Sequence, residues 1–281
     1  MSQVLYIIGN GFDLHYGLET GVSTFKKLLS QKYIDTVGIN ALELFDSYGV
    51  NWGDYEMSLS DLDLNSVKDS IMTYPDYLSD HESDREDCIY YTNMHINQLI
   101  DAVYDSLHEM IQNANSQLQS INHDYIELLS INECSPIVSF NYTSTLELLY
   151  GIKAYHIHGL YEDGDNLIFG YKDMNSEKLL SGLEEDYYVD AQIDSINQLY
   201  ADFKKKIQIN QLREYLSLIG RVDIVIVFGH SMSLVDYEYF DMINKLLSPS
   251  EWRVSYHNKN DTVLLNASQY LFCDKIKFFR L

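Results

Sequence analysis

Four segments of the sequence place polar, chemistry-bearing residues directly after an apolar run. The runs are VLYII, IVSF, AYHI and DIVIVF, and the segments that follow them are GNGFD (9–13), NYTSTLE (141–147), HG (158–159) and GHSMSLVD (229–236). Short runs rich in β-branched residues are typical of strands inside a covered parallel sheet. Ligands of α/β proteins bind beyond the carboxyl ends of such strands, so these four segments are the first candidates for a site.

The turn after the first run is rich in glycine. Gly9 and Gly11 permit a tight turn and a close approach by a ligand, and a helix opening within Phe12 to Leu18 would offer free N–H groups to an anion. The dinucleotide-binding fingerprint is incomplete, because Leu14 stands where its third glycine would be. The alternative is an ordinary strand-to-helix turn in which Asp13 caps the helix.

The polar cluster after the second run begins with Asn141. Its position at the end of a strand makes Asn141 a candidate for a functional role. Hydroxyl side chains commonly cap helices, so we expect Thr143 or Ser144 to cap the helix that follows.

The third segment contains two histidines in alternation. Residues two apart on a strand face the same way, so His156 and His158 could form a pair. His158 lies at the end of the strand beside Gly159, which favours a functional role, whereas His156 fits a structural role equally well. A metal site would need a third ligand, which the spacing does not supply.

The fourth segment repeats the architecture of the first. A buried strand is followed by Gly229, small polar residues and a helix whose start carries Asp236. Two glycine turns could therefore face one ligand. Ser231 or Ser233 could contact a phosphate or a ribose, or could cap the helix. No glycine closes a GxSxG pattern after Ser231, which argues against serine hydrolase chemistry.

The expected fold class is α/β, a Rossmann-like parallel sheet with helices on both faces and a helical insertion. Residues 1–281 are expected to form a single domain, and residues 55–133 a mostly helical insertion within it. The predicted strands are Val4–Ile8, Ile137–Phe140, Ala154–Ile157, Leu167–Phe169, Asp223–Phe228, Trp252–Tyr256 and Lys275–Phe279.

Apolar residues at helical spacing support the insertion. The residues are Ile96, Ile100, Val103, Leu107 and Met110, which form one amphipathic face. A second helical region is predicted from Asp186 to Ile219, with Lys204, Lys205 and Lys206 as a solvated basic face. The acidic stretch Ser79–Asp87 is expected to be an exposed loop.

The composition narrows the classes of partner. Lys and Arg number 19 against 42 Asp and Glu, a formal charge of −23, so the surface repels the phosphates of bulk nucleic acid. A small-molecule nucleotide held by backbone amides is still compatible with this charge. Cys88, Cys134 and Cys273 form no CxxC pair, which indicates reduced thiols and no structural zinc. Without a signal-type segment or an apolar run of membrane-spanning length, we expect a cytoplasmic protein.

Five motifs in order resemble one protein family over nearly the whole chain. They are IIGNGFD, WGDYE (Trp52–Glu56), SFNYTSTLE, HIHG and FGHSMSLVDYEYF, and this order resembles the AbiH family of bacterial abortive-infection proteins. That family is in turn similar to sirtuin-like domains of phage defence, in which a comparable set of residues surrounds NAD.

The resemblance implies a Rossmann-like NAD site and a phage-defence effector that hydrolyses NAD. By this resemblance the catalytic residues are Asn141 and His158, with Asp13 beside them. The implied NAD-binding residues are Gly9, Asn10, Gly11, Phe12, Gly229, His230, Ser231 and Asp236. NAD would be the substrate, with no metal. The chain lacks the four-cysteine zinc module of deacetylase sirtuins, and Phe12 and Asp13 replace the small and hydroxyl residues common at the helix start.

Cleavage of the nicotinamide–ribose bond passes through a ribosyl oxocarbenium ion and needs no protonation of the leaving group. Asn141 is suited to orient water or a ribose hydroxyl, and neutral His158 to act as a base near physiological pH. Asp13 could bond a ribose hydroxyl or face the developing positive charge.

Two other functions fit the same residues. Asp13, Asp54, Glu56 and Asp236 could assemble a magnesium site in a nuclease or a nucleotide phosphohydrolase, although Asp54 and Glu56 also fit a solvated pair beside a core-anchoring Trp52. A nucleotide sensor without turnover would instead signal through the helical insertion to a regulatory partner or to a second copy of the chain.

Overall fold

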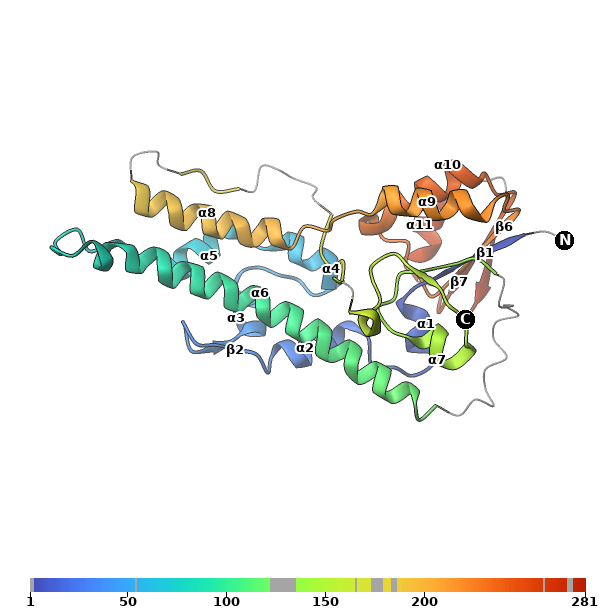
Figure 1. Cartoon of the computed structure of the whole chain (residues 1–281), viewed down its shortest axis with the longest axis horizontal. Helices are drawn as coiled ribbons and strands as arrows, with labels where there is room; N and C mark the ends of the chain where they lie inside the picture. Colours follow the sequence, from blue (N-terminus) through green and yellow to red (C-terminus); the bar gives the residue numbers. More distant parts are fainter. Residues whose placement is uncertain are drawn as a thin grey trace. The chain divides into compact units, whose positions relative to one another are not determined.

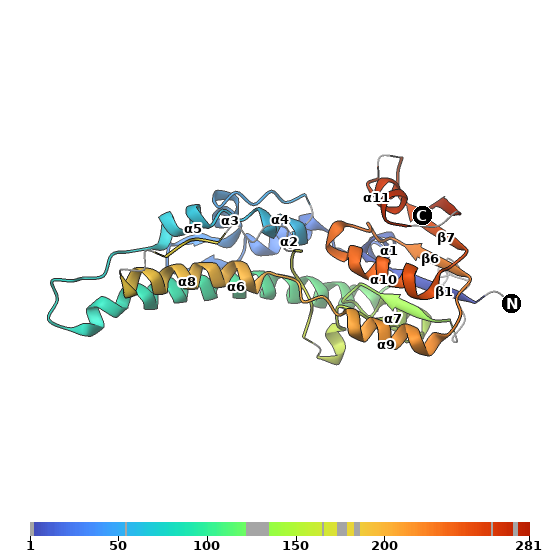
Figure 2. The same cartoon turned by 90° about the horizontal axis from the view of Figure 1, so that it is seen from above.

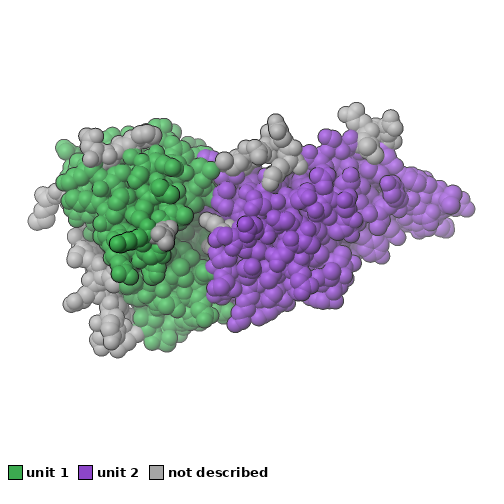
Figure 3. Space-filling view, turned by 180° about the vertical axis from the view of Figure 1, so that it is seen from behind, with its two compact units in different colours: residues 1–21, 110–168, 206–281 green, residues 22–109, 169–205 purple. Residues whose placement is uncertain are grey.

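The computed structural model describes residues 3–53, 55–121, 135–164, 166–172, 179–182, 186–259, 261–271 and 275–281. The chain divides into two compact units, coloured separately in Figure 3. Unit 1 comprises residues 1–21, 110–168 and 206–281, and unit 2 comprises residues 22–109 and 169–205. The helical unit thus begins earlier than the expected insertion 55–133 and includes a second segment, whereas part of that expected range, 122–133, lies outside the described residues. The single domain stays a prediction.

In the described part of the chain, unit 1 holds a six-stranded parallel sheet (Figure 1). Its strands are β1 (Val4–Ile8), β4 (Ile137–Ser139), β5 (Tyr155–His156), β6 (Ile224–Phe228), β7 (Glu251–Tyr256) and β8 (Ile276–Arg280). All neighbouring strands pair in parallel, in the order β5-β4-β1-β6-β7-β8.

The strand order defines a doubly wound sheet. From β1 the chain moves outward through β4 to β5, then returns to place β6 on the other side of β1 and continues to β7 and β8. The direction of winding therefore reverses between β1 and β6, which is the arrangement of Rossmann folds. The predicted Rossmann-like α/β fold is confirmed.

Both faces of the sheet are covered by helices. Leu5 and Ile7 pack in one cluster and Tyr6 and Ile8 in another, because successive residues of a strand point to opposite faces. The first cluster draws on α9 (Ile209–Ile219), α10 (Tyr237–Leu247) and α11 (Val263–Tyr270), and the second on α1 (Asn10–His15) and α7 (Thr145–Tyr150). This two-sided burial explains why the strands are apolar throughout.

Unit 2 is mostly helical. Its elements are α2 (Val22–Leu29), β2 (Tyr33–Ile34), β3 (Ile39–Asn40), α3 (Ala41–Ser47), α4 (Tyr55–Ser58), the 3₁₀ helix η1 (Leu59–Asp61), α5 (Leu64–Ile71) and α8 (Tyr187–Asp202). Helix α6 (Glu82–Leu118) runs side by side with α8 in Figures 1 and 2 and continues into unit 1. Thr92 and Asn93 on α6 bond Gln192 and Ser195 on α8. No described helix is both long and apolar enough to cross a bilayer.

The predicted strand Leu167–Phe169 is wrong. The segment forms no strand with the described residues, and the Ile168 N–H instead donates to the carbonyl of His158. The other predicted strands form within one or two residues of their expected ends.

Two predictions about charged surface segments also need correction. Helix α6 begins at Glu82, so most of the stretch Ser79–Asp87 is helical, not a loop. In the lysine trio, Lys204 and Lys206 are exposed, but Lys205 is buried and its Nζ lies 2.9 Å from Oε2 of Glu56. Lys205 is buried because this carboxylate offsets the cost of removing its charge from water.

Candidate functional site

The predicted site residues gather at the carboxyl edge of the sheet. Gly9 follows β1, Asn141 follows β4, His158 follows β5 and Gly229 follows β6, and all of these strands are parallel. All of them belong to unit 1. The edge includes the switch point between β1 and β6, where doubly wound folds bind their ligands.

The two glycine turns pack directly against each other at this switch point. The Gly11 N–H donates to the carbonyl of Gly229 over 2.6 Å. A Cβ on Gly229 would lie 2.2 Å from the Phe12 nitrogen, and Gly229 has a φ of +64°, which disfavours other residues. A Cβ on Gly9 would meet the Cα of His230 at 2.7 Å. Glycine is therefore required here by the contact between two turns.

This contact uses N–H groups that were expected to bind phosphate. The Gly9 N–H donates to Phe228, that of Gly11 to Gly229, and that of Phe12 back to Gly9. Phe12 itself is fully buried in the apolar core. In this conformation, an anion would reach the Gly11 N–H only if the two turns separated, whereas the Gly9 N–H is bonded to the end of β6 and the Phe12 N–H within its own turn.

Asp13 is buried behind the first turn, with 1% of its surface exposed. Its carboxylate accepts hydrogen bonds from the hydroxyls of Thr143 at 2.6 Å and Thr145 at 2.7 Å. Burial raises the pKa of Asp13 to about 6, although these hydrogen bonds oppose the shift. The helix-cap alternative for Asp13 is wrong, because the N-cap of α1 is Gly9 and Asp13 lies within the helix.

Asn141 lies beside Asp13. Its amide nitrogen donates to the carbonyl of Gly9 at 3.2 Å, and its hydrogen bond to Asp13 helps to hold down the pKa of that carboxyl group. Its Oδ1 is buried and has no hydrogen-bond partner among the described residues. A buried acceptor left unsatisfied costs free energy, so this atom is available to a donor on a bound molecule.

The expected caps of helix α7 are wrong. Ser144 occupies the N-cap position, but its side chain makes no capping bond. The hydroxyl of Thr143 bonds Asp13, and its neighbour Thr145 does the same from the first position of the helix. These hydroxyls satisfy a buried carboxylate instead of the helix end.

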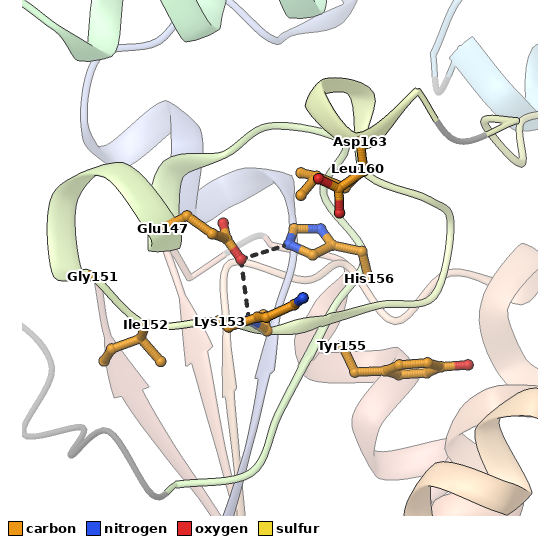
Figure 4. A pocket seen from close by; sticks show the side chains of 9 residues that line it. Glu147, Gly151, Ile152, Lys153, Tyr155, His156, Leu160 and Asp163 are labelled. Atoms are coloured by element: carbon orange, nitrogen blue, oxygen red, sulfur yellow. Dashed lines mark hydrogen bonds and ion pairs between the residues drawn. The ribbon is translucent and has the colours of Figure 1, made fainter.

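His156 forms an ion pair with Glu147 on the wall of a pocket of about 490 Å³ (Figure 4). Figure 4 shows Glu147, on α7, pointing toward the His156 ring. His156 Nε2 lies 3.1 Å from Oε1 of Glu147, which also accepts from the Ala154 N–H. The pocket is further lined by Gly151, Ile152, Lys153, Tyr155, Leu160 and Asp163.

The partners of His156 define its charge. Its Nδ1 lies 2.8 Å from the carbonyl of Asn141, which can only accept, so Nδ1 carries a proton. Nε2 faces the carboxylate of Glu147, another acceptor, so these contacts favour the imidazolium form of His156. Burial opposes this charge, but the hydrogen bonds to Glu147 and Asn141 outweigh it and raise the pKa of His156. For Glu147, burial is likewise outweighed by the hydrogen bond from His156, which lowers its pKa.

His158 does not pair with His156, and the expected shared orientation is wrong. Strand β5 ends at His156, and the chain turns through Gly159, which has a φ of +86°. His158 Nε2 lies 3.4 Å from Oδ1 of Asp236, and Nε2 of His230 lies 3.4 Å from Oδ2 of the same carboxylate. All three side chains are at least nine-tenths buried.

The backbone fixes the proton on one of these histidines. Nδ1 of His230 accepts from the Met232 N–H at 2.8 Å, so a neutral His230 carries its proton on Nε2, facing Asp236. The ring of Phe140 lies between the two histidines, with centroid distances of 5.1 Å to His158 and 4.3 Å to His230. Asp236 therefore holds two imidazole rings in an otherwise aromatic environment.

The remaining candidates lie apart from these groups. Ser231 is exposed, Ser233 makes no capping bond at the 3₁₀ helix η5 (Leu234–Asp236), and the Asn10 amide donates to the Thr20 carbonyl. In unit 2, Trp52 packs on Phe25 and Phe45, and Glu56 pairs with Lys205. Asp54 lies outside the described residues. Among the residues that are described, no group of three or more His, Cys, Asp or Glu side chains could hold a metal ion.

Two residues that bond the candidate site residues were not predicted from the sequence. Glu147 and Thr145 complete the surroundings of His156 and Asp13, yet both were part of the segment NYTSTLE. The position of both residues in the helix that follows the strand could have indicated this role. A short helix that starts directly after a candidate strand turns its first residues back toward the strand end, as Thr145 and Glu147 do here.

The fold and the site define an α/β protein of the doubly wound class, with a buried cluster of acids, amides and histidines at the switch-point edge. A family model described as bacteriophage abortive infection AbiH matches residues 5–256. The chain therefore belongs to the AbiH family, which supports a role in abortive infection by bacteriophage. No curated protein matches the chain significantly.

Proposed function

We propose that the cluster at the carboxyl edge of the sheet binds NAD and hydrolyses its nicotinamide–ribose bond. The observation that carries this proposal is the position of Asn141, Asp13 and His158 together at the switch-point edge, with Oδ1 of Asn141 buried and without a hydrogen-bond partner among the described residues. Ligands of doubly wound folds bind at this edge. The choice of NAD as the nucleotide comes from the similarity of the AbiH family to sirtuin-like domains that surround NAD with a comparable set of residues.

The reaction needs stabilised positive charge and a positioned water molecule. The bond between C1′ of ribose and the nicotinamide nitrogen breaks, and its electron pair leaves with the neutral base. Water adds to C1′ of the oxocarbenium ion and loses one proton, which a base accepts. The products are nicotinamide, ADP-ribose and a proton.

The side chains fit these tasks. Asn141 orients water or a ribose hydroxyl through its amide, and His158 accepts the proton, with Asp236 3.4 Å from its Nε2 to stabilise the charged ring. Asp13 has a pKa of about 6, so it is mostly ionised at neutral pH and faces the developing positive charge.

Substrate entry requires the two glycine turns to separate. The second turn carries a non-glycine residue with positive φ, Met232 at +51°, and the segment between β6 and η5 has no regular structure. Movement of this segment away from Gly11 would release the Gly11 N–H for the pyrophosphate.

Nicotinamide release from NAD tests the proposal. We expect release by the unmodified protein in the presence of a chelator, and a loss of at least a hundredfold in His158→Ala and Asn141→Ala. Matched controls are His15→Ala and Asn113→Ala, two exposed positions in unit 1, which should keep full activity. Equal activity in all four variants would refute the assigned site, and release that stops with chelator would refute metal-free chemistry.

A further inference from the structure

An exposed aromatic surface lies at one end of unit 2 and is not used by the proposed function. Five tyrosines and one leucine are between 53% and 97% exposed there: Tyr74, Tyr77, Leu78, Tyr90, Tyr91 and Tyr187. We call this set the tyrosine surface. It is formed by the segment before α6 and by the first turns of α6 and α8, whose starts lie side by side in Figures 1 and 2.

Contacts within unit 2 connect the parts of the tyrosine surface. The Tyr77 hydroxyl donates to Asp186, the N-cap of α8, and its ring contacts Tyr188 with a centroid distance of 6.4 Å. Hydrogen bonds between Thr92 and Gln192 and between Ser195 and Asn93 join α6 to α8. The surface is therefore continuous across three segments.

The charge around the tyrosine surface is strongly negative. Exposed acids follow one another at its centre: Asp76, Asp80, Glu82, Asp84, Glu86 and Asp87. Among the described residues from 73 to 93, Arg85 is the one Lys or Arg side chain. A large group of exposed apolar and aromatic side chains on a protein surface commonly marks a site that binds another molecule.

We propose that the tyrosine surface binds a protein partner that presents arginine and lysine side chains. Tyrosine rings attract guanidinium and ammonium groups through cation–π contacts, and the acids around them supply complementary charge. Tyrosine and arginine are also the residue types most enriched where protein interfaces gain their affinity.

The sign of the charge excludes other macromolecules. Phosphates of nucleic acid and of anionic membranes are repelled by six acids. A second copy of the chain would bring a formal charge of −23 to the contact. Of these partners, a basic protein surface is the one that would be attracted by both the tyrosine rings and the acidic side chains.

Binding of an arginine-rich peptide, measured by fluorescence anisotropy, tests the proposal. The probe is a synthetic peptide in which arginine alternates with serine, and its counterpart has glutamate in place of arginine. The surface variant is Tyr74→Ser, Tyr90→Ser and Tyr187→Ser combined. The control variant combines Tyr33→Ser, Leu218→Ser and Leu265→Ser, which are equally exposed elsewhere. Both variants keep the charge of −23, so general attraction between opposite charges is the same in both.

We expect the arginine peptide to bind the unmodified protein and the control variant with similar affinity. It should bind the surface variant at least tenfold more weakly. The glutamate peptide should bind none of the three proteins. Equal affinity for the surface variant and the control would overturn the proposal. NMR spectra of the unmodified protein give a second readout that does not depend on the variants. The ring signals of Tyr74, Tyr90 and Tyr187 should shift on addition of the arginine peptide, and unchanged signals would also overturn it.

Discussion

His156 and His158 stand two residues apart, and the structure gives them different surroundings. His156 lies on the wall of a pocket and pairs with Glu147, whose side chain is 24% exposed. His158 is 3% exposed and shares the buried carboxylate of Asp236 with His230. Both are histidine–carboxylate contacts, but one borders a pocket and the other is enclosed by aromatic rings.

The two pairs are expected to contribute differently to stability. An ion pair near water contributes little to stability, because solvent already stabilises its charges. A carboxylate buried between two histidines is costly to place, and removing it leaves buried polar groups without a partner. We therefore propose that Glu147 only stabilises the positive charge of His156 beside the pocket. The proposed chemistry belongs to the cluster of Asp236, His158 and His230.

The largest effect should come from opening the contact that encloses the buried cluster. Gly229→Ala places a methyl group 2.2 Å from the Phe12 nitrogen at a positive φ, so we expect a loss of about 4 kcal/mol or more in the free energy of unfolding. Gly151→Ala is the control, because its φ of +66° is similar but no atom would lie within 4 Å of the added Cβ. It should cost about 1 kcal/mol. Urea unfolding measures both, and equal losses would show that the contact between the turns is unimportant.

The next effect compares the two carboxylates directly. Asp236→Ala should cost about 3 kcal/mol, since it removes the shared partner of two buried histidines. Glu147→Ala should cost less, about 1–2 kcal/mol, because the Glu147 side chain is 24% exposed whereas that of Asp236 is 8% exposed. Thermal and urea unfolding of both variants give the difference. A larger loss for Glu147→Ala would reverse the comparison.

Asp13 extends the comparison to a buried carboxylate whose hydroxyl donors are neutral. Folding raises its pKa from 3.8 to about 6, so its contribution to stability is full below pH 3.8 and is lost as the pH rises through 6. Asp13→Asn lacks this dependence. The stability of the variant relative to the parent should therefore rise by about 2.4 kcal/mol between pH 4 and 7, at roughly 1.4 kcal/mol per pKa unit. Urea unfolding across this range is the measurement, and a constant difference would contradict the raised pKa.

The smallest expected effect is a change in the pKa of His156. Its pKa is raised above 6.5, so its contribution to stability is full below pH 6.5 and is lost as the pH rises through the pKa of the folded state. Glu147→Gln should lower this pKa by removing the partner charge. NMR titration of the His156 ring signals measures both values. An unchanged pKa in the variant would show that Glu147 does not hold the proton.

The sequence predicted the sheet well because its strands are buried on both faces. Val4–Ile8 and Asp223–Phe228 are apolar without alternation, and both form strands within a residue of their expected limits. Leu167–Phe169 is equally apolar, but its carbonyl and N–H groups find no strand beside them. A short apolar segment does not reveal whether another strand lies beside it to accept its hydrogen bonds.

Which polar residues meet at the edge was harder to predict. The sequence indicated that Asn141 and His158 lie at strand ends, with Asp13 at the start of the helix after the first turn, and the parallel sheet brings these strand ends to one edge. It gave no sign that Gly11 and Gly229 contact each other, or that Thr143 and Thr145 bond Asp13, because such contacts depend on the packing of segments more than 100 residues apart.

Titration calorimetry of NAD into the His158→Ala protein tests the central claim most directly. This variant lacks the proposed base but keeps Asn141, Asp13 and both glycine turns, so bound NAD would not be consumed during the titration. We expect saturable binding of one NAD per chain, which is lost when Gly11 is also replaced by a bulky residue. Absence of binding in His158→Ala, together with no nicotinamide release by the unmodified protein, would contradict it.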